Sequence, residues 1–178
     1  MDLRAKRTRQ NIINAFIELR SAKPLEKITI KELAELAVIN KATFYLHFKD
    51  IYDLSDTLEN EVIQSAFHDI PGFQDFLTAP YDTTFALFRA FNAQGQLFKI
   101  VFGGNRSNVF IEKMEARFKD MANLAYPNQD KPKVNIYISM LIQGIFHGYM
   151  SNREQYEDEV LVTALAHAAE SIIQLMGE

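Results

Sequence analysis

Two short helical segments in tandem, between Thr29 and Phe48, constrain the fold of this chain more than any other feature. The first runs from Thr29 to about Ala37 with apolar residues at helical spacing, and the second begins directly after Asn40. Isolated helices shorter than about 12–15 residues are marginal in water, so both segments must pack on a third element. Residues 8–22 supply it, because their apolar side chains fall on one helical face. The sequence therefore predicts a three-helix unit near the N-terminus.

Residues suited to helix capping mark where the two short segments begin. Thr29 and Glu32 match the capping box, in which the hydroxyl accepts from an early amide and the carboxylate accepts from the amide of the capping residue. Asn40 is a favourable N-cap for a helix over 41–48. A short helix, a tight turn through residues 38–40 and a second short helix are typical of a helix-turn-helix, whose second helix enters the major groove of DNA.

Helical periodicity continues through the rest of the chain. A fourth helix is expected after Asp50, ending before the break at Pro71-Gly72, and another over 107–125. The last two run from about 132 to 150 and from Ser151 to about 176, the latter opened by a second capping-box match between Ser151 and Glu154. The sequence has no strand-like alternation of useful length, so the predicted fold class is all-α.

Charge is distributed unevenly between the two parts of the chain. Residues 1–50 hold ten Lys or Arg and six Asp or Glu, a net charge of +4, whereas residues 51–178 carry a net charge of −8. A basic head on an acidic body suits a protein that presents one end to phosphate. Chance asymmetry is the alternative, since charge informs partners and not folds.

Several classes of function lack their sequence signatures. The chain has no cysteine, phosphate-cradling glycine loop, nucleophile elbow or paired-histidine metal motif. We therefore expect no catalytic activity and no cofactor, and His68 and His147 lack the close partners that a metal site needs. Neither a signal-peptide core nor about 18 consecutive apolar residues occur, which predicts a cytoplasmic protein with no membrane partner.

The N-terminal part of the sequence resembles the TetR family of transcriptional regulators. The matching residues are Arg7, Ile12 to Phe16, Thr29-Ile30, Leu33-Ala34, Ala37, Lys41 to Phe48, and Leu54. The resemblance covers about residues 5–58 and implies a helix-turn-helix DNA-binding domain over 1–50 and a helical sensor and dimerisation domain over 51–178. It also implies a repressor that binds a palindromic operator as a homodimer and is released by a small apolar ligand.

Two positions depart from the family pattern. The family usually has glycine where Val38 stands in the turn, and lysine where Ile51 opens the fourth helix. Val38 must adopt an ordinary backbone conformation or accept strain. Ile51 removes a charge that the family normally places on phosphate. Both changes keep a second hypothesis open, in which a TetR-like regulator acts through a partner protein without a small-molecule inducer.

The resemblance assigns DNA contacts to residues of the basic arm and the recognition helix: Arg4, Lys6, Arg7, Thr29, Asn40, Lys41, Ala42, Thr43, Tyr45, His47 and Lys49. Arginine and lysine of the arm neutralise phosphate or reach a minor groove, unless the arm is a solvated, disordered terminus. Lys41 suits guanine or, equally, a phosphate, and Ala42 and Thr43 suit a thymine methyl group. Tyr45, His47 and Lys49 are expected on phosphates, whereas the phenylalanines of this segment belong to the core.

The C-terminal part predicts a dimer interface and a ligand pocket. Its last two helices are apolar on more than one side, so one side is expected against a second copy, through Tyr137, Leu141, Ile145, Leu161, Leu165, Ala168 and Ile172. A monomeric core is the alternative. An apolar pocket is expected around Phe85, Phe88, Phe91, Asn92, Phe98 and His147, with plain core packing as its alternative.

Overall fold

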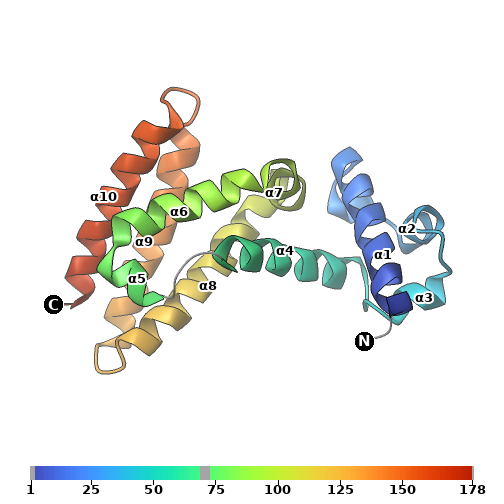
Figure 1. Cartoon of the computed structure of the whole chain (residues 1–178), viewed down its shortest axis with the longest axis horizontal. Helices are drawn as coiled ribbons and strands as arrows, with labels where there is room; N and C mark the ends of the chain where they lie inside the picture. Colours follow the sequence, from blue (N-terminus) through green and yellow to red (C-terminus); the bar gives the residue numbers. More distant parts are fainter. Residues whose placement is uncertain (1–2, 69–72, 178) are drawn as a thin grey trace. The chain divides into compact units, whose positions relative to one another are not determined.

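The computed structural model describes residues 3–68 and 73–177, and within these ranges it is all-helical (Figure 1). Ten α-helices and two short 3-10 helices are present, and no strand occurs among the described residues. This confirms the predicted all-α class. The predicted break at Pro71-Gly72 lies outside the described residues. The chain divides into two compact units, residues 1–64 with 94–106, and residues 65–93 with 107–178.

Unit 1 holds the two short helices and the elements around them. Its helices are α1 (Leu3–Ala22), the 3-10 helix η1 (Leu25–Lys27), α2 (Ile30–Leu36), α3 (Lys41–Tyr45), most of α4 (Ile51–His68), α7 (Gly95–Phe102) and the 3-10 helix η2 (Gly104–Arg106). The unit thus extends past residue 50 and includes a segment from the middle of the sequence, because α7 packs against α1.

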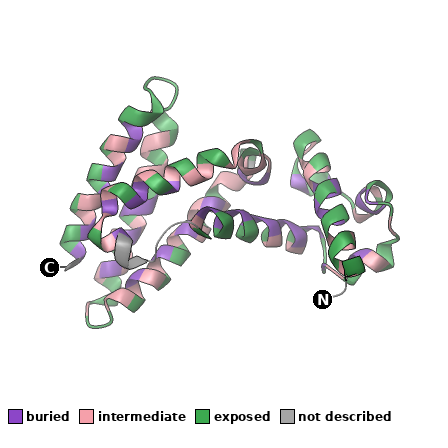
Figure 2. Ribbon diagram, in the orientation of Figure 1, coloured by how far each residue is buried: buried purple, intermediate pink, exposed green. Residues whose placement is uncertain are grey.

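The core of unit 1 is built from the faces that the helical periodicity predicted. Ile12 and Phe16 of α1, Leu33 of α2, Phe44 of α3 and Leu54 of α4 are all fully buried. Figure 2 shows the burial alternating along each helix, as expected for amphipathic helices around a shared core. The two short helices are therefore held by tertiary packing, which supplies the stability that their length does not.

A buried ion pair joins α4 to η2 within unit 1. Glu59 has no exposed surface, and its Oε1 accepts hydrogen bonds from Ser55 Oγ at 2.8 Å and from Arg106 Nε at 3.1 Å. Arg20 of α1 donates to the backbone oxygen of Ile100 in α7 at 3.0 Å, and burial lowers the pKa of its guanidinium. These contacts explain why residues 94–106 belong to the same unit as the N-terminal helices.

Unit 2 contains the end of α4, then α5 (Phe73–Thr78), α6 (Pro80–Ala93), α8 (Ser107–Ala125), α9 (Lys131–Asn152) and α10 (Asp158–Gly177). In it α10 packs against α6 and α9, and α8 packs against α9. Phe118 of α8 lies at its centre, with ring centroids 5.0 Å from Phe76 and 5.8 Å from Phe67. α9 and α10 approach closely at Gly148, where a Cβ would lie 2.9 Å from Leu165 Cδ2.

The predicted start of the last helix is wrong. α9 continues to Asn152, and α10 begins only at Asp158. The Ser151 hydroxyl lies 3.4 Å from His147 Nε2, so it does not act as an N-cap. The short connection is instead held by the Tyr149 hydroxyl, which donates to Asp158 Oδ1 at 2.8 Å. The matching spacing at Ser151 is thus fortuitous, because this residue lies inside α9.

One helix of the described chain, α10 over Asp158–Met176, is long and apolar enough to cross a membrane by length and composition alone. Its buried side chains Val162, Ala166, Ala169 and Ile173 face the rest of unit 2. A core helix of this kind has the same composition, so the finding is weak evidence for a membrane span.

Candidate nucleic-acid interface

The exposed side of α3 brings together most of the residues predicted to contact bases. Asn40 caps the helix as expected, because its Oδ1 accepts from the Thr43 amide at 2.7 Å and from the Thr43 hydroxyl at 2.9 Å. Lys41 and Ala42 follow in the first turn and are exposed, while Thr43 is partly covered. The cap therefore fixes the helix end that presents these side chains.

The other side of α3 anchors it in the core. Phe44 is fully buried, and its ring centroid lies 5.9 Å from that of Phe48. α3 ends at Tyr45, earlier than the predicted 41–48, and the Phe48 amide still donates to the Phe44 oxygen at 3.0 Å. Tyr45 is more than half exposed and His47 is partly covered. The two phenylalanines thus hold the polar residues between them at the surface, as predicted.

The turn before α3 adopts a strained conformation at Val38. Its φ of 56° is the one positive φ of a non-glycine residue in the described chain. The Val38 amide donates to Glu35 O at 3.2 Å and the Ile39 amide to Ala34 O at 2.9 Å, which is the Schellman pattern at the end of α2. That pattern puts Val38 where glycine is normally found, so of the two predicted possibilities the structure shows strain.

The basic arm is helical rather than irregular from Leu3 onward. Arg4, Lys6 and Arg7 are exposed on α1, and the Thr8 hydroxyl donates to the Arg4 oxygen at 3.0 Å. Arg9 differs, because it pairs with Glu61 of α4 and its guanidinium lies 5.6 Å from the centre of the Phe48 ring. Arg9 therefore helps to hold α1 against the α3–α4 connection.

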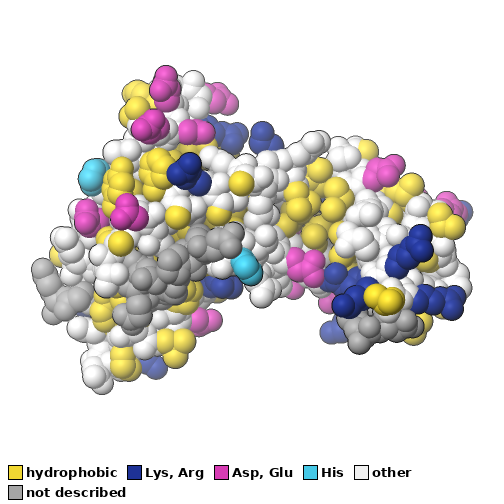
Figure 3. All heavy atoms as spheres, viewed as in Figure 1, with side chains coloured by type: hydrophobic (Ala, Val, Ile, Leu, Met, Phe, Trp, Pro, Cys, Tyr) yellow, Lys and Arg dark blue, Asp and Glu magenta, His cyan; other side chains and the backbone are white. Residues whose placement is uncertain are grey.

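The Glu32 carboxylate of α2 is engaged within unit 1. Glu32 accepts from Lys23 Nζ at 2.8 Å and from the Thr29 hydroxyl at 2.8 Å, and these hydrogen bonds lower its pKa to about 2. The Thr29–Glu32 capping box is complete, which confirms the predicted start of α2. On the face shown in Figure 3, Lys and Arg side chains gather over the first three helices, with exposed hydrophobic side chains among them.

Two exposed residues on either side of Lys49, Leu46 after α3 and Tyr52 in the first turn of α4, had no predicted role. Leu46 and Tyr52 are large, apolar and well exposed, and they flank Lys49, which is also exposed. The Lys49 amide donates to Asp53 Oδ2 at 2.9 Å, so its backbone is fixed. Ile51 is buried in the core of unit 1. Leu46 lies inside the motif that resembles the TetR family. Its apolar type is typical of a core residue, and only the structure shows that it is exposed.

The residues predicted to line a ligand pocket are not brought together in one unit. Phe85, Phe88, Phe91 and Asn92 lie on α6 of unit 2, and His147 lies exposed on α9. Phe98 lies on α7 of unit 1, where its ring centroid is 5.1 Å from that of Phe102.

Within unit 2 the α6 aromatics make core contacts. The Phe88 centroid lies 5.1 Å from Tyr149, and the Phe91 centroid lies 5.1 Å from Phe110. Burial, followed by the hydrogen bond to Asp158, raises the pKa of Tyr149. These distances are those of packed rings, which favours the alternative of core packing for this cluster.

The predicted dimer residues divide between the inside and the outside of unit 2. Leu141 and Leu161 are only 1% and 8% exposed, so they belong to the core of the subunit. Tyr137, Ile145, Leu165 and Ile172 are partly covered, and Ala168 is exposed. Four larger apolar residues on the same helices are well exposed instead: Ile136, Met140, Val160 and Leu175.

Among the described residues, no three His, Cys, Asp or Glu side chains converge as a metal site would require. The comparisons with known proteins give no family for the chain. No protein-family model and no curated protein matches it.

Proposed function

We propose that the chain is a sequence-specific DNA-binding transcriptional regulator of the TetR type. The observation that carries the proposal is the first turn of α3, which is capped by Asn40 and exposed. It belongs to a pair of short helices within residues 1–50, which have a net charge of +4. Lys41 and Ala42 are exposed there, and the turn at Val38 separates α3 from α2. A helix fixed on one side by core packing and open on the other suits the major groove.

The proposal gives the surrounding residues distinct roles. Lys41, Ala42 and Thr43 contact base edges, because the N-terminal residues of a recognition helix lie deepest in the groove. Tyr45, His47 and Lys49 contact phosphates, as do Arg4, Lys6 and Arg7 along α1. Thr29, whose hydroxyl is engaged with Glu32, approaches phosphate through the start of α2.

The experiment begins by selecting a preferred duplex from a random library and then titrates it, and a scrambled duplex, at two salt concentrations. Tyr45→Ala and Lys49→Ala are expected to weaken binding to both duplexes, and Lys49→Ala to reduce the salt slope by about 1. Thr43→Ala is expected to change the preferred sequence. Lys131→Ala, which removes an exposed lysine from α9, is the matched control and should leave binding unchanged.

Unchanged binding after all three head substitutions would refute the assignment. The alternative, a regulator that acts through a partner protein, predicts that the purified chain selects no duplex and co-purifies with a protein. The strain at Val38 and the burial of Ile51 are the observations that keep this alternative in the test.

The regulator is proposed to act as a homodimer through the outer sides of α9 and α10. Ile136 and Met140, one turn apart on α9, are 58% and 57% exposed, and Val160 and Leu175 of α10 are also exposed, so these apolar side chains are proposed to form the face that meets a second copy. A two-fold pair of such faces would present two heads to a palindromic operator. Light scattering after size exclusion is expected to give a dimer, and Met140→Glu a monomer. A monomeric wild-type chain at micromolar concentration would refute the dimer.

Release of DNA by a small apolar ligand bound in unit 2 completes the proposal. Phe88 and Phe91 of α6, which pack against Tyr149 and Phe110, are the proposed binding residues. The ligand would replace part of this packing. Screening small hydrophobic compounds for a raised melting temperature, followed by the DNA titration with each hit, tests this step. If every compound that binds the chain leaves its DNA affinity unchanged, release of DNA by such a ligand is refuted.

A further inference from the structure

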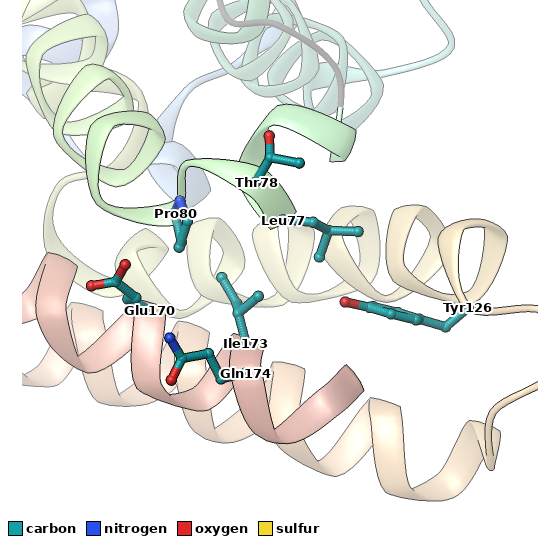
Figure 4. Close-up of a pocket in the computed structure, with 7 residues that line it drawn as sticks. All are labelled: Leu77, Thr78, Pro80, Tyr126, Glu170, Ile173 and Gln174. Carbon is teal, nitrogen blue, oxygen red and sulfur yellow. The ribbon is translucent and has the colours of Figure 1, made fainter. Parts of the chain in front are cut away.

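A cleft at one end of unit 2 lies apart from the α6 aromatics predicted to bind a ligand. It has a volume of about 270 Å³ and is lined by residues of α5, α6 and α10 and by the residue that follows α8 (Figure 4): Leu77, Thr78, Pro80, Tyr126, Glu170, Ile173 and Gln174. Leu77, Pro80 and Ile173 contribute its apolar lining, and the other four residues carry polar groups. This volume lies just below the range of about 300–1,000 Å³ that is typical of ligand pockets, so it suits only a small organic molecule.

The charge of the cleft has one sign. Of the seven described residues that line it, Glu170 alone is charged, and none is Lys or Arg. The one basic side chain that the structure records near that carboxylate is His167, with Nδ1 3.8 Å from Glu170 Oε2. The Glu170 side chain is 43% exposed, so its carboxylate is open to a cation that enters the cleft from solvent.

Helix ends add to the negative potential. α8 ends at Ala125, directly before Tyr126, and α10 ends at Gly177, just after Gln174. Neither helix has a basic residue in its last turn, so the partial negative charge of its C-terminal end is not offset there. α6 begins at Pro80 with the opposite polarity, but Asp82 in its first turn offsets that positive end.

The two ends of the cleft differ in chemistry. Figure 4 shows Glu170 and Gln174 together on α10 at one end and the Tyr126 ring at the other, with Leu77 and Ile173 between them. The Tyr126 hydroxyl points toward these two apolar side chains. Burial raises the pKa of Tyr126, so its phenol keeps its proton and remains a donor at neutral pH.

We propose that this cleft is a binding site for a small organic ammonium ion with an apolar or aromatic body. Glu170 pairs with the ammonium group and the Gln174 side-chain oxygen accepts one of its N–H groups. The body of the ligand lies between Leu77 and Ile173 and meets the Tyr126 ring. The inference concerns unit 2 alone and does not rest on DNA binding by unit 1.

Calorimetric titration of the full chain with 2-phenylethylammonium tests the site directly. At pH 8 we expect saturable binding with a dissociation constant of about 0.1–1 mM. The neutral analogue 2-phenylethanol has nearly the same shape and should bind at least tenfold more weakly, because it lacks the charge that Glu170 recognises.

Two variants separate the charged end from the aromatic end. Glu170→Gln should lower affinity for the ammonium ion about tenfold without changing affinity for the alcohol, and Tyr126→Ala should lower both. Glu112→Gln removes an exposed carboxylate from α8 and is the matched control, expected to bind like the wild type. Circular dichroism checks that each variant is folded.

Three outcomes would overturn the proposal. They are the absence of saturation up to about 10 mM ammonium ion, equal affinity for the ammonium ion and the alcohol, and unchanged affinity in a folded Glu170→Gln variant. The last two would show that the cleft binds aromatic bodies without recognising charge.

Discussion

Replacing Val38 by glycine should stabilise unit 1. Val38 occupies the left-handed region with φ 56°, and its side chain is 89% exposed, so the substitution removes strain without removing buried surface. The left-handed conformation costs an L-residue about 1–2 kcal/mol. Glycine relieves this cost, but it also raises the conformational entropy of the unfolded chain, which lowers the free energy of unfolding by about 0.4–1 kcal/mol. The net expectation is a gain of about 0.5–1 kcal/mol.

Urea unfolding of the full chain, followed by circular dichroism, measures the effect. Val38→Ala keeps a Cβ at the same φ and should recover less of the strain than Val38→Gly. Ala42→Gly provides the matched control, because it puts glycine into the exposed helical turn of α3 and should cost about 1 kcal/mol.

A Val38→Gly chain that is no more stable than the wild type would refute the reasoning. It would mean that the turn at the end of α2 does not hold Val38 in the left-handed region. A gain equal to that of Val38→Ala would instead show that loss of the branched side chain, and not relief of the backbone, was responsible.

Four further substitutions test a helix cap and two carboxylates. Asn40→Ala removes the cap of α3 and should cost about 1 kcal/mol in urea unfolding. Arg106→Leu takes the guanidinium from the buried Glu59 carboxylate and should cost about 3–5 kcal/mol, with much of the loss recovered when Glu59→Leu is added. Glu115 has a pKa lowered to about 2 by hydrogen bonds from Lys119, Ser139 and Gln143, so it contributes stability above its ordinary pKa of 4.5 that is lost as pH falls toward 2. Glu115→Gln should therefore flatten the loss of stability between about pH 4.5 and 2, measured as melting temperature against pH.

Local signals predicted the head of the chain well. The Thr29–Glu32 box and the Asn40 cap place the starts of α2 and α3 where the structure has them, since capping is a short-range hydrogen-bond pattern. The buried positions of Phe44 and Phe48 also followed from the spacing of apolar residues. The proposed base-contacting surface is the other side of the same helix, so it was predictable for the same reason.

Long-range packing was not predictable in the same way. The membership of residues 94–106 in unit 1 depends on Arg20 reaching the Ile100 oxygen, a contact between residues far apart in sequence. In α9 and α10, apolar residues occupy more than one side, so their periodicity does not say which side faces the core. Leu141 and Leu161 were therefore assigned to a partner surface although the subunit buries them.

The sequence also could not show that the predicted pocket residues divide between the two units. Aromatic residues at helical spacing mark a buried face but not the unit to which that face belongs, and Phe98 lies on α7 of unit 1 while Phe91 lies on α6 of unit 2. The cleft at Glu170 had no sequence signal at all. It is formed where α5, α6 and α10 meet the residue after α8, and only the structure brings these four segments together.

The two departures from the TetR pattern act on the proposed function through different physics. Ile51 is buried and adds apolar core where that pattern has a lysine, so it strengthens unit 1 while removing one cation from the proposed phosphate-binding surface. Val38 is exposed and weakens unit 1 through its backbone, yet the Schellman hydrogen bonds at Glu35 and Ala34 are kept, so the direction of α3 is preserved. DNA affinity in the proposed regulator is therefore lowered mainly by the missing charge at residue 51. A weaker dependence on salt, rather than a loss of sequence preference, is the consequence that follows.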